Sequence, residues 1–125
     1  MTAPVAVGPH ASGAPSAWLE RWAHLIQPAS RVLDVACGHG RHLRWAAALG
    51  HHPLGIDRDA MALVTARNVA TVIEADIENG PWPLEGETFG AVLVTHYLWR
   101  PLLPRIVASL APDGVLLYET FAVGN

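Results

Sequence analysis

Two acidic residues follow a short turn of small residues at intervals that suit a nucleotide-type ligand. The turn is built around Ala36, Gly38 and Gly40, whose small or absent side chains let the backbone approach a bound group closely. Asp57, seventeen residues beyond Gly40, offers a carboxylate that can accept hydrogen bonds from both hydroxyls of a ribose. Asp76 offers another acceptor, suited to the exocyclic amine of an adenine. Together these residues favour a nucleotide cofactor.

Each of these residues also has an ordinary structural explanation. Gly38 and Gly40 could serve a common turn, and Asp57 or Asp76 could cap a helix or lie in a solvated loop. For Asp34, a structural role is as well supported as a role in the site. In the structural role its carboxylate would accept hydrogen bonds from backbone N–H groups. The order of the turn and the two acids along the chain, rather than any single residue, indicates the site.

Strands and helices alternate along the chain. Strands are expected at 31–36, 53–56, 71–75, 89–95 and 115–121, and helices at 16–26, 41–49, 59–67 and from residue 101. This alternation favours a Rossmann-like, doubly wound α/β fold with a mostly parallel sheet of about five strands. Ligands bind such sheets at the carboxyl ends of the strands, so Thr95 and His96 are expected beside the turn.

Some details of these elements are also predicted. Asp59 is expected to cap the helix at 59–67, with Met61, Leu63 and Val64 on its buried side. Val107 is expected on the buried side of the last helix. The segment 76–88 shows no clear helical pattern. Pro112-Asp113-Gly114 predicts a turn before the fifth strand.

The composition restricts the classes of protein to which the chain can belong. It has 125 residues, about half of them apolar, which predicts one domain over 16–125 after a flexible arm over 1–15. The formal charge of −3 provides no basic surplus for nucleic acid. The chain shows no secretory signal and no run of about 20 apolar residues, so we expect a cytoplasmic protein without a membrane span.

Chemistry that depends on lysine or on several cysteines is excluded. All eight basic residues are arginine, so neither a Schiff-base lysine nor a P-loop lysine can occur. Cys37 is the single cysteine and is better explained as a small packing residue than as a nucleophile. The seven histidines form no metal-binding motif, so no metal is expected.

A dinucleotide cofactor is an alternative that the turn itself disfavours. Dinucleotide folds use the pattern Gly-x-Gly-x-x-Gly, whose third glycine allows a helix and a strand to pack closely. Counted from Gly38, this chain has Leu43 at that position. We therefore rank a dinucleotide-dependent oxidoreductase third, after the two hypotheses given below.

The same segments resemble the motifs of a known family. Residues 32–42, Val-Leu-Asp-Val-Ala-Cys-Gly-His-Gly-Arg-His, are similar to the first motif of class I S-adenosylmethionine-dependent methyltransferases. The resemblance is greatest to the small bacterial group related to tellurite-resistance methyltransferases. Segments 55–59, 74–78 and 110–116 resemble the second motif, the adenine-contacting motif and the turn into the fifth strand. The resemblance covers about residues 30–121.

The resemblance implies S-adenosylmethionine as the cofactor and methyl transfer to an unidentified small-molecule acceptor. The turn would surround the methionine part, the second motif the ribose and the third the adenine, and the end of the fourth strand would border the methyl-transfer crevice. The cofactor-binding residues implied are Ala36, Gly38, Gly40, Asp57, Arg58, Asp76, Ile77 and Thr95. No catalytic residue is identified; the candidates for a general base are His96, Tyr97 and Glu119.

The chain also departs from the family pattern. Thr95-His96-Tyr97-Leu98 stands where methyltransferases that act on amino groups of nucleic-acid bases have Asn-Pro-Pro-Tyr or Asp-Pro-Pro-Tyr. Family members continue into an antiparallel strand pair, whereas this chain ends at Asn125. The expected consequence is an open edge at 115–121, with self-association or a partner chain along it. A cofactor-binding or partner-binding module without turnover is therefore the second hypothesis.

Overall fold

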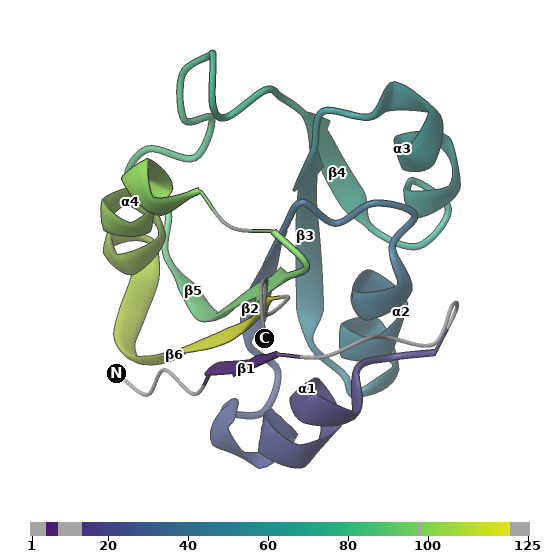
Figure 1. The fold of residues 1–125 in the computed structure, drawn as a ribbon. Helices are drawn as coiled ribbons and strands as arrows, with labels where there is room; N and C mark the ends of the chain where they lie inside the picture. The colour runs from purple at the N-terminus through teal and green to yellow at the C-terminus, as the bar shows by residue number, and fades with distance from the viewer. Residues whose placement is uncertain (1–4, 8–13, 98, 121–125) are drawn as a thin grey trace.

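The six strands found in the described part of the chain belong to one parallel sheet (Figure 1). The structure is a computed structural model that describes residues 5–7, 14–97 and 99–120. In spatial order the strands are β1, β6, β5, β2, β3 and β4. Their bounds are Val5–Val7 for β1, Arg31–Val35 for β2, His52–Asp57 for β3, Thr71–Glu74 for β4, Phe89–Thr95 for β5 and Leu110–Thr120 for β6. The predicted Rossmann-like sheet is confirmed, with β1 as an additional strand.

Helices cover both faces of this sheet. They are α1 (Ala17–Trp22), the 3-10 turn η1 (Ala23–Leu25), α2 (Arg41–Ala48), α3 (Ala60–Ala66), η2 (Arg100–Leu102) and α4 (Leu103–Ala108). Residues of α1 and α2 pack on one face, and those of η2 and α4 pack on the other (Figure 1). The segment between β4 and β5 contains only turns, as its sequence predicts.

The central strands are apolar on both faces because both faces are covered. On β2, Val32 belongs to the α1 and α2 side of the core, whereas Leu33 belongs to the α4 side. The same alternation places Thr95 and Glu119 on the face of α1 and α2, since Val94 and Tyr118 lie on the α4 side. The buried polar side chains of β5 and β6 therefore share one face of the sheet.

The buried side of α3 differs from the prediction. Leu63 is fully buried as expected, but Met61 and Val64 are 81% and 61% exposed. The buried positions besides Leu63 are the small residues Ala62 and Ala66, since α3 packs closely against the turn before α2. Val107, also expected to be buried, is 46% exposed. Side-chain hydrophobicity alone could not reveal these tight contacts.

The edge predicted to be open is partly paired. Val5–Val7 lies parallel to β6, with Val5 opposite Tyr118 and Val7 opposite Thr120. The prediction of an unpaired edge is therefore wrong for these residues of β6, whose partner Val5–Val7 comes from the segment expected to form a flexible arm. Residues 1–4, 8–13 and 121–125 lie outside the described residues. Self-association through this edge stays a prediction.

The predicted turn at Pro112-Asp113-Gly114 lies within β6 as an irregularity. Phe89 pairs with Leu110, whereas Ala91 already pairs with Val115, so β6 contains extra residues between the two pairs. Asp113 has a positive φ of 64°. A Cβ on Gly114 would come within 2.8 Å of the Ala111 carbonyl oxygen, so glycine is required at that position.

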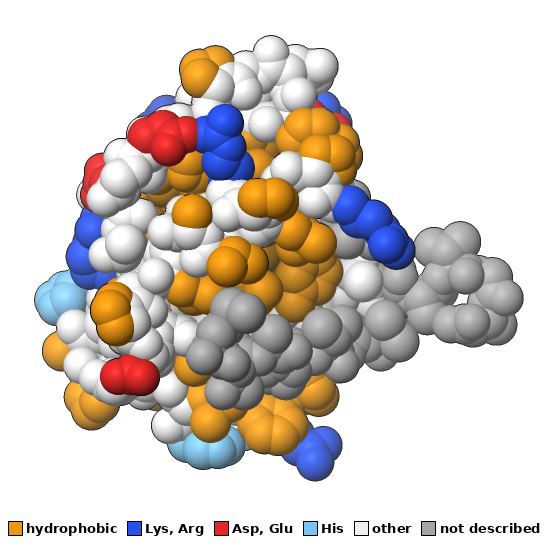
Figure 2. All heavy atoms as spheres, turned by 90° about the vertical axis from the view of Figure 1, so that its left-hand side faces the viewer, with side chains coloured by type: hydrophobic (Ala, Val, Ile, Leu, Met, Phe, Trp, Pro, Cys, Tyr) orange, Lys and Arg blue, Asp and Glu red, His pale blue; other side chains and the backbone are white. Residues whose placement is uncertain are grey.

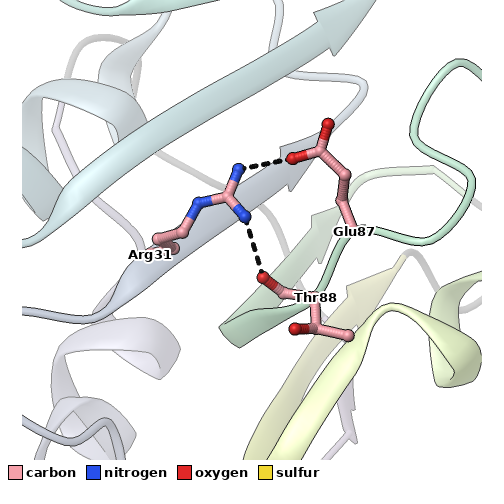
Figure 3. Close-up of polar contacts among 3 residues, drawn as sticks. All are labelled: Arg31, Glu87 and Thr88. Atoms are coloured by element: carbon pink, nitrogen blue, oxygen red, sulfur yellow. Dashed lines mark hydrogen bonds and ion pairs between the residues drawn. The ribbon is translucent and has the colours of Figure 1, made fainter.

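Charged contacts at the amino ends of the strands are structural. Arg31, at the start of β2, donates to Glu87 Oε1 at 2.8 Å and to the Thr88 carbonyl oxygen at 3.1 Å (Figure 3). Its guanidinium also lies 4.4 Å from the centre of the Phe89 ring. These contacts fix the segment before β5 to β2 at the end of the sheet where such folds do not bind ligands.

The surface beside α4 and β6 is mostly apolar or neutral at its centre, with charged side chains around its margin (Figure 2). No helix within the described residues has both the length and the apolar character needed to cross a membrane.

Candidate functional site

Two adjoining hollows lie at the carboxyl ends of the strands and share Ala36. The first has a volume of about 110 Å³ and is lined by Ala36, Ile56, Asp57, Arg58, Ala75, Asp76, Ile77, Glu78 and Tyr97. The second has a volume of about 360 Å³ and is lined by Ala36, Cys37, Gly38, His39, Arg41, His42, Arg44, Thr95 and His96. The helices that follow β2 and β5 cover opposite faces, so this crevice lies at the switch point of the sheet (Figure 1).

The turn after β2 adopts left-handed backbone conformations. Ala36 has φ of 60° and Gly38 has φ of 57°. The conformation strains the alanine and not the glycine, since a Cβ disfavours it. A Cβ added to Gly38, which lines the second hollow, would meet nothing within 4 Å. The turn thus leaves an open cradle beside the backbone at Gly38, as its sequence predicts.

Gly40 packs closely against α3, and its predicted contact with the cofactor stays a prediction. It lines neither hollow. Its φ is 95°, and an added Cβ would lie 3.2 Å from both Cα and Cβ of Ala66 on α3. A larger residue would push α3 away from the turn, so the geometry accounts for this glycine without a ligand.

Asp57 connects the two loops that border the first hollow. Its Oδ2 accepts a hydrogen bond from the Gly38 N–H at 2.8 Å, and its Oδ1 accepts one from the Asp59 N–H at 2.8 Å. A carboxylate has about four acceptor positions, so each oxygen can still accept a bond from a ligand. Asp59 in turn caps α3 through Met61 N–H and Ala62 N–H, as predicted.

Asp76 is held in a similar way by the turn that follows it. Its Oδ1 accepts from the Glu78 N–H at 3.1 Å and the Asn79 N–H at 3.2 Å, and its Oδ2 accepts from Asn79 Nδ2 at 3.1 Å. The bond from the Asn79 side chain is the main cause that lowers the pKa of Asp76. The predicted neighbours Arg58 and Ile77 line the same hollow.

Tyr97 and Glu78 close one side of the first hollow, a contact that sequence reasoning missed. The Tyr97 hydroxyl donates to Glu78 Oε2 at 2.7 Å, and the Tyr118 hydroxyl donates to the Tyr97 carbonyl oxygen at 3.0 Å. Burial and the bond to Glu78 raise the pKa of Tyr97. This hydroxyl therefore stays protonated and joins the loop after β4 to the loop after β5.

A buried polar network lies behind the second hollow and joins four elements. The Ser16 N–H donates to His42 Nε2 at 3.1 Å, and the Ser16 hydroxyl donates to Glu119 Oε1 at 2.7 Å. His42 Nδ1 lies 3.4 Å from Thr95 Oγ1. Since Nε2 accepts, a neutral His42 carries its proton on Nδ1 and directs it toward Thr95. A histidine on the buried face of α2 was the only sign of this network in the sequence.

Asp34 lies below the turn and is almost completely buried, with 1% of its surface exposed. Burial, followed by the charge of Asp57, raises its pKa to about 8, although Arg41 acts in the opposite direction. Its Oδ1 has no hydrogen-bond partner within the described residues. The position of Asp34 in a strand suggested that its carboxylate pairs with backbone N–H groups. For Oδ1, no such pairing is found within the described residues.

Cys37, a free cysteine, lies buried in the turn after β2. Burial is the main cause that raises the pKa of Cys37 to about 12, so the thiol stays protonated and suits the predicted packing role. Across the described residues, no group of three His, Cys, Asp or Glu side chains is arranged to hold a metal ion.

Comparisons of the sequence identify relatives. The model of a family described as "Methyltransferase domain" matches residues 32–114. Trans-aconitate 2-methyltransferase of Paracidovorax citrulli is 34% identical over 105 residues, which are 75% of this chain and 40% of that protein.

Solved structures share the fold at low sequence identity. A TehB-like SAM-dependent methyltransferase from Corynebacterium glutamicum has a TM-score of 0.67 at 22% identity, over 80% of this chain and 60% of its own. A SAM-dependent methyltransferase from Geobacter sulfurreducens, in complex with S-adenosyl-L-homocysteine, has a TM-score of 0.65 at 20% identity, over 84% of this chain and 48% of its own. The chain thus spans less than two thirds of the length of these relatives.

Proposed function

Since the chain belongs to the class I S-adenosylmethionine-dependent methyltransferases, we propose that its crevice binds S-adenosylmethionine and that the domain transfers a methyl group to a small-molecule acceptor. The observation that carries this proposal is the pair of hollows joined at Ala36. The ligand has an adenosine part and an amino-acid part, and the two hollows offer different surroundings to each. The relative from Paracidovorax citrulli is named for trans-aconitate, a small carboxylic acid, which supports a small-molecule acceptor.

The first hollow suits the adenosine part. Asp57 would accept hydrogen bonds from the ribose hydroxyls, since its carboxylate is already oriented by two backbone N–H groups. Asp76 and the backbone of Ile77 would hold the adenine edge, and Arg58 lines the wall beside them. The bond between Tyr97 and Glu78 would limit the width of the hollow.

The second hollow suits the methionine part. The cradle at Gly38 leaves room beside the backbone, and Arg41 would pair with the carboxylate of the amino acid. Thr95 borders the hollow with its hydroxyl held toward His42. When bound, the cofactor supplies an electrophilic methyl group on a sulfonium. The protein contributes mainly by positioning the acceptor, a contribution that can be large.

The three candidates for a general base differ in their placement. Tyr97 lines the first hollow and donates to Glu78. Glu119 is buried and accepts a bond from Ser16. Only His96 of the three lines the second hollow, so it is the candidate that stands beside the acceptor.

Cofactor binding is tested by thermal unfolding of the chain with S-adenosylmethionine, S-adenosylhomocysteine or NAD. A ligand at a hundredfold excess over its Kd adds about 2.7 kcal/mol to the free energy of unfolding. For a domain of this size we expect the melting temperature to rise by several degrees with the first two ligands and to stay unchanged with NAD. A rise with NAD alone would overturn the assignment in favour of an oxidoreductase.

Turnover is tested separately, by release of S-adenosylhomocysteine in the presence of small-molecule acceptors. Release above the rate without acceptor supports methyl transfer. Binding without release from any acceptor would favour the alternative of a cofactor-binding or partner-binding module.

A further inference from the structure

The two hollows differ in the balance of charge among the side chains that line them. The first hollow has three acids, Asp57, Asp76 and Glu78, and one arginine, Arg58. The second hollow has two arginines and three histidines, with no acid among the described residues that line it: Arg41, Arg44, His39, His42 and His96. The surroundings of the second hollow therefore favour negatively charged ligands.

Neither of the two acids buried near the second hollow belongs to its lining. Asp34 lies below the turn rather than in the lining, and its pKa of about 8 keeps the carboxyl mostly protonated at neutral pH. Glu119 lies behind His42 and is engaged by the Ser16 hydroxyl. The hollow thus presents cationic and imidazole groups to any ligand that enters it.

The second hollow has one arginine more than the carboxylate of the cofactor would engage. The methionine part of the cofactor carries one carboxylate, with which Arg41 would pair, together with an ammonium and a sulfonium that arginines do not bind. Arg44 lies three residues further along α2, on the same side of the helix, and is exposed in the hollow. Arg44 forms no ion pair with the described residues, whereas Arg31 is paired with Glu87 (Figure 3) and Arg105 with Glu85.

His96 reaches the lining of this hollow through an unfavourable backbone conformation. His96 has φ of 57°, and its N–H donates to the Glu119 carbonyl oxygen at 2.8 Å. The only non-glycine residues of the crevice lining with positive φ, within the described residues, are His96 and Ala36, and both border the second hollow. Strain of this kind persists where the surrounding structure determines a useful position.

We propose that the methyl acceptor carries a carboxylate, which Arg44 binds in the second hollow together with His39 and His96. This proposal rests on the proposed function. An arginine recognises a carboxylate with two parallel hydrogen bonds, and imidazoles add further donors. Transfer to a carboxylate oxygen forms the oxygen–methyl bond and breaks the sulfur–methyl bond. The electron pair of the broken bond returns to sulfur, and no proton moves.

A carboxylate acceptor would not require a strong base in the site. Carboxylates are ionised at neutral pH, so the nucleophilic oxygen arrives without a proton to remove. Tyr97 and Glu119 are both engaged in hydrogen bonds elsewhere, which suits such an acceptor.

The experiment is titration calorimetry on the chain saturated with S-adenosylhomocysteine. The probes are succinate, benzoate and tricarballylate, each compared with its neutral amide. We expect at least one acid to bind 10-fold or more tightly than its amide, and the binding to weaken as ionic strength rises. Arg44→Gln should lower the affinity for that acid by about 10- to 150-fold, the loss of a hydrogen bond to a charged group. Its affinity for S-adenosylhomocysteine should stay within twofold.

Arg67→Gln is the matched control, because Arg67 is exposed at the end of α3 and lines neither hollow. It should bind the acid like the unaltered chain. Amides that bind as tightly as the acids, no acid that binds, or an Arg44→Gln variant with unaltered affinity would overturn the proposal while leaving the cofactor assignment intact. A chain that does not bind S-adenosylhomocysteine at all would overturn both.

Discussion

The two hollows of the crevice fix their polar groups by different means. In the first, backbone N–H groups hold the carboxylates of Asp57 and Asp76. One of these groups, that of Gly38, belongs to the neighbouring turn, and the others lie two or three residues after the acid that they contact. In the second, Thr95 is positioned through His42 and Ser16, which belong to different elements. The comparison teaches that local sequence determines one half of the site, whereas the packing of distant segments determines the other.

This difference has an energetic consequence. Carboxylates that the backbone already orients lose little conformational entropy when a ligand binds, so the first hollow is prepared for its ligand. Arg44, by contrast, has a long and exposed side chain that must become ordered on binding. We therefore expect the first hollow to provide most of the cofactor affinity and the second to provide selectivity for the acceptor.

The largest expected effect follows from removal of the Asp57 carboxylate. Asp57→Ala should lower the affinity for S-adenosylhomocysteine by about 10- to 150-fold, since hydrogen bonds to a charged group contribute roughly 1.5–3 kcal/mol. It should also destabilise the fold, because the N–H groups of Gly38 and Asp59 lose their acceptor. Titration calorimetry and urea unfolding measure the two effects.

Asp57→Asn separates the two effects. Its amide oxygen can still accept one of the two backbone bonds, so it should recover part of the stability but little of the affinity. Unaltered affinity in Asp57→Ala would remove this residue from the site and would contradict the expectation that the acids of the first hollow provide most of the cofactor affinity.

A smaller effect, which depends on pH, is expected from Asp34 below the second hollow. Its pKa of about 8 in the folded chain exceeds the ordinary value of 3.8. The folded state therefore holds a proton that the unfolded state has lost, and the free energy of unfolding should fall as the pH rises from about 4 to about 8. Asp34→Asn carries no such proton, so its stability should exceed that of the unaltered chain increasingly over this range.

Urea unfolding at pH 5 and pH 9 checks this expectation. The free energy of unfolding of Asp34→Asn should exceed that of the unaltered chain by more at pH 9 than at pH 5. Parallel pH profiles for the two proteins would mean that Asp34 is not neutral below the hollow, and would weaken the contrast in charge between the two halves.

The smallest expected effect concerns Ala36, the residue that both hollows share. Its φ of 60° is strained for alanine, so Ala36→Gly should stabilise the fold by about 0.5–1 kcal/mol, net of the greater chain entropy of glycine. Ala29→Gly is the control outside the crevice, because Ala29 has a similar φ of 53° and is exposed. Thermal unfolding should show similar gains in both variants. A loss of stability in Ala36→Gly alone would show that the Cβ of Ala36 makes contacts that hold the two hollows together.

Much of the site follows from residues that act close to their own position in the chain. The order of strands and helices, the cap at Asp59 and the positions of Asp57 and Asp76 at strand ends agree with the sequence predictions. Each depends on hydrophobic period, on a side chain that bonds a nearby backbone group, or on the rule that parallel strands place their carboxyl ends together. Such interactions involve few residues, so the sequence contains the information needed to predict them.

Other features arise only when distant segments pack together. The hydrogen bond from Ser16 to Glu119 joins residues 103 positions apart, and that from Ser16 to His42 joins residues 26 apart. Val5–Val7 forms a strand only because β6 supplies its partner. The exposure of Met61 depends on the narrow space between α3 and the turn at Gly40. The sequence by itself determined the fold and the acids of the first hollow, because those depend on local propensity and patterning. Only the tertiary structure decided the polar network and the charge of the second hollow, because buried hydrogen bonds form where packing excludes water from groups that the chain brings together from afar.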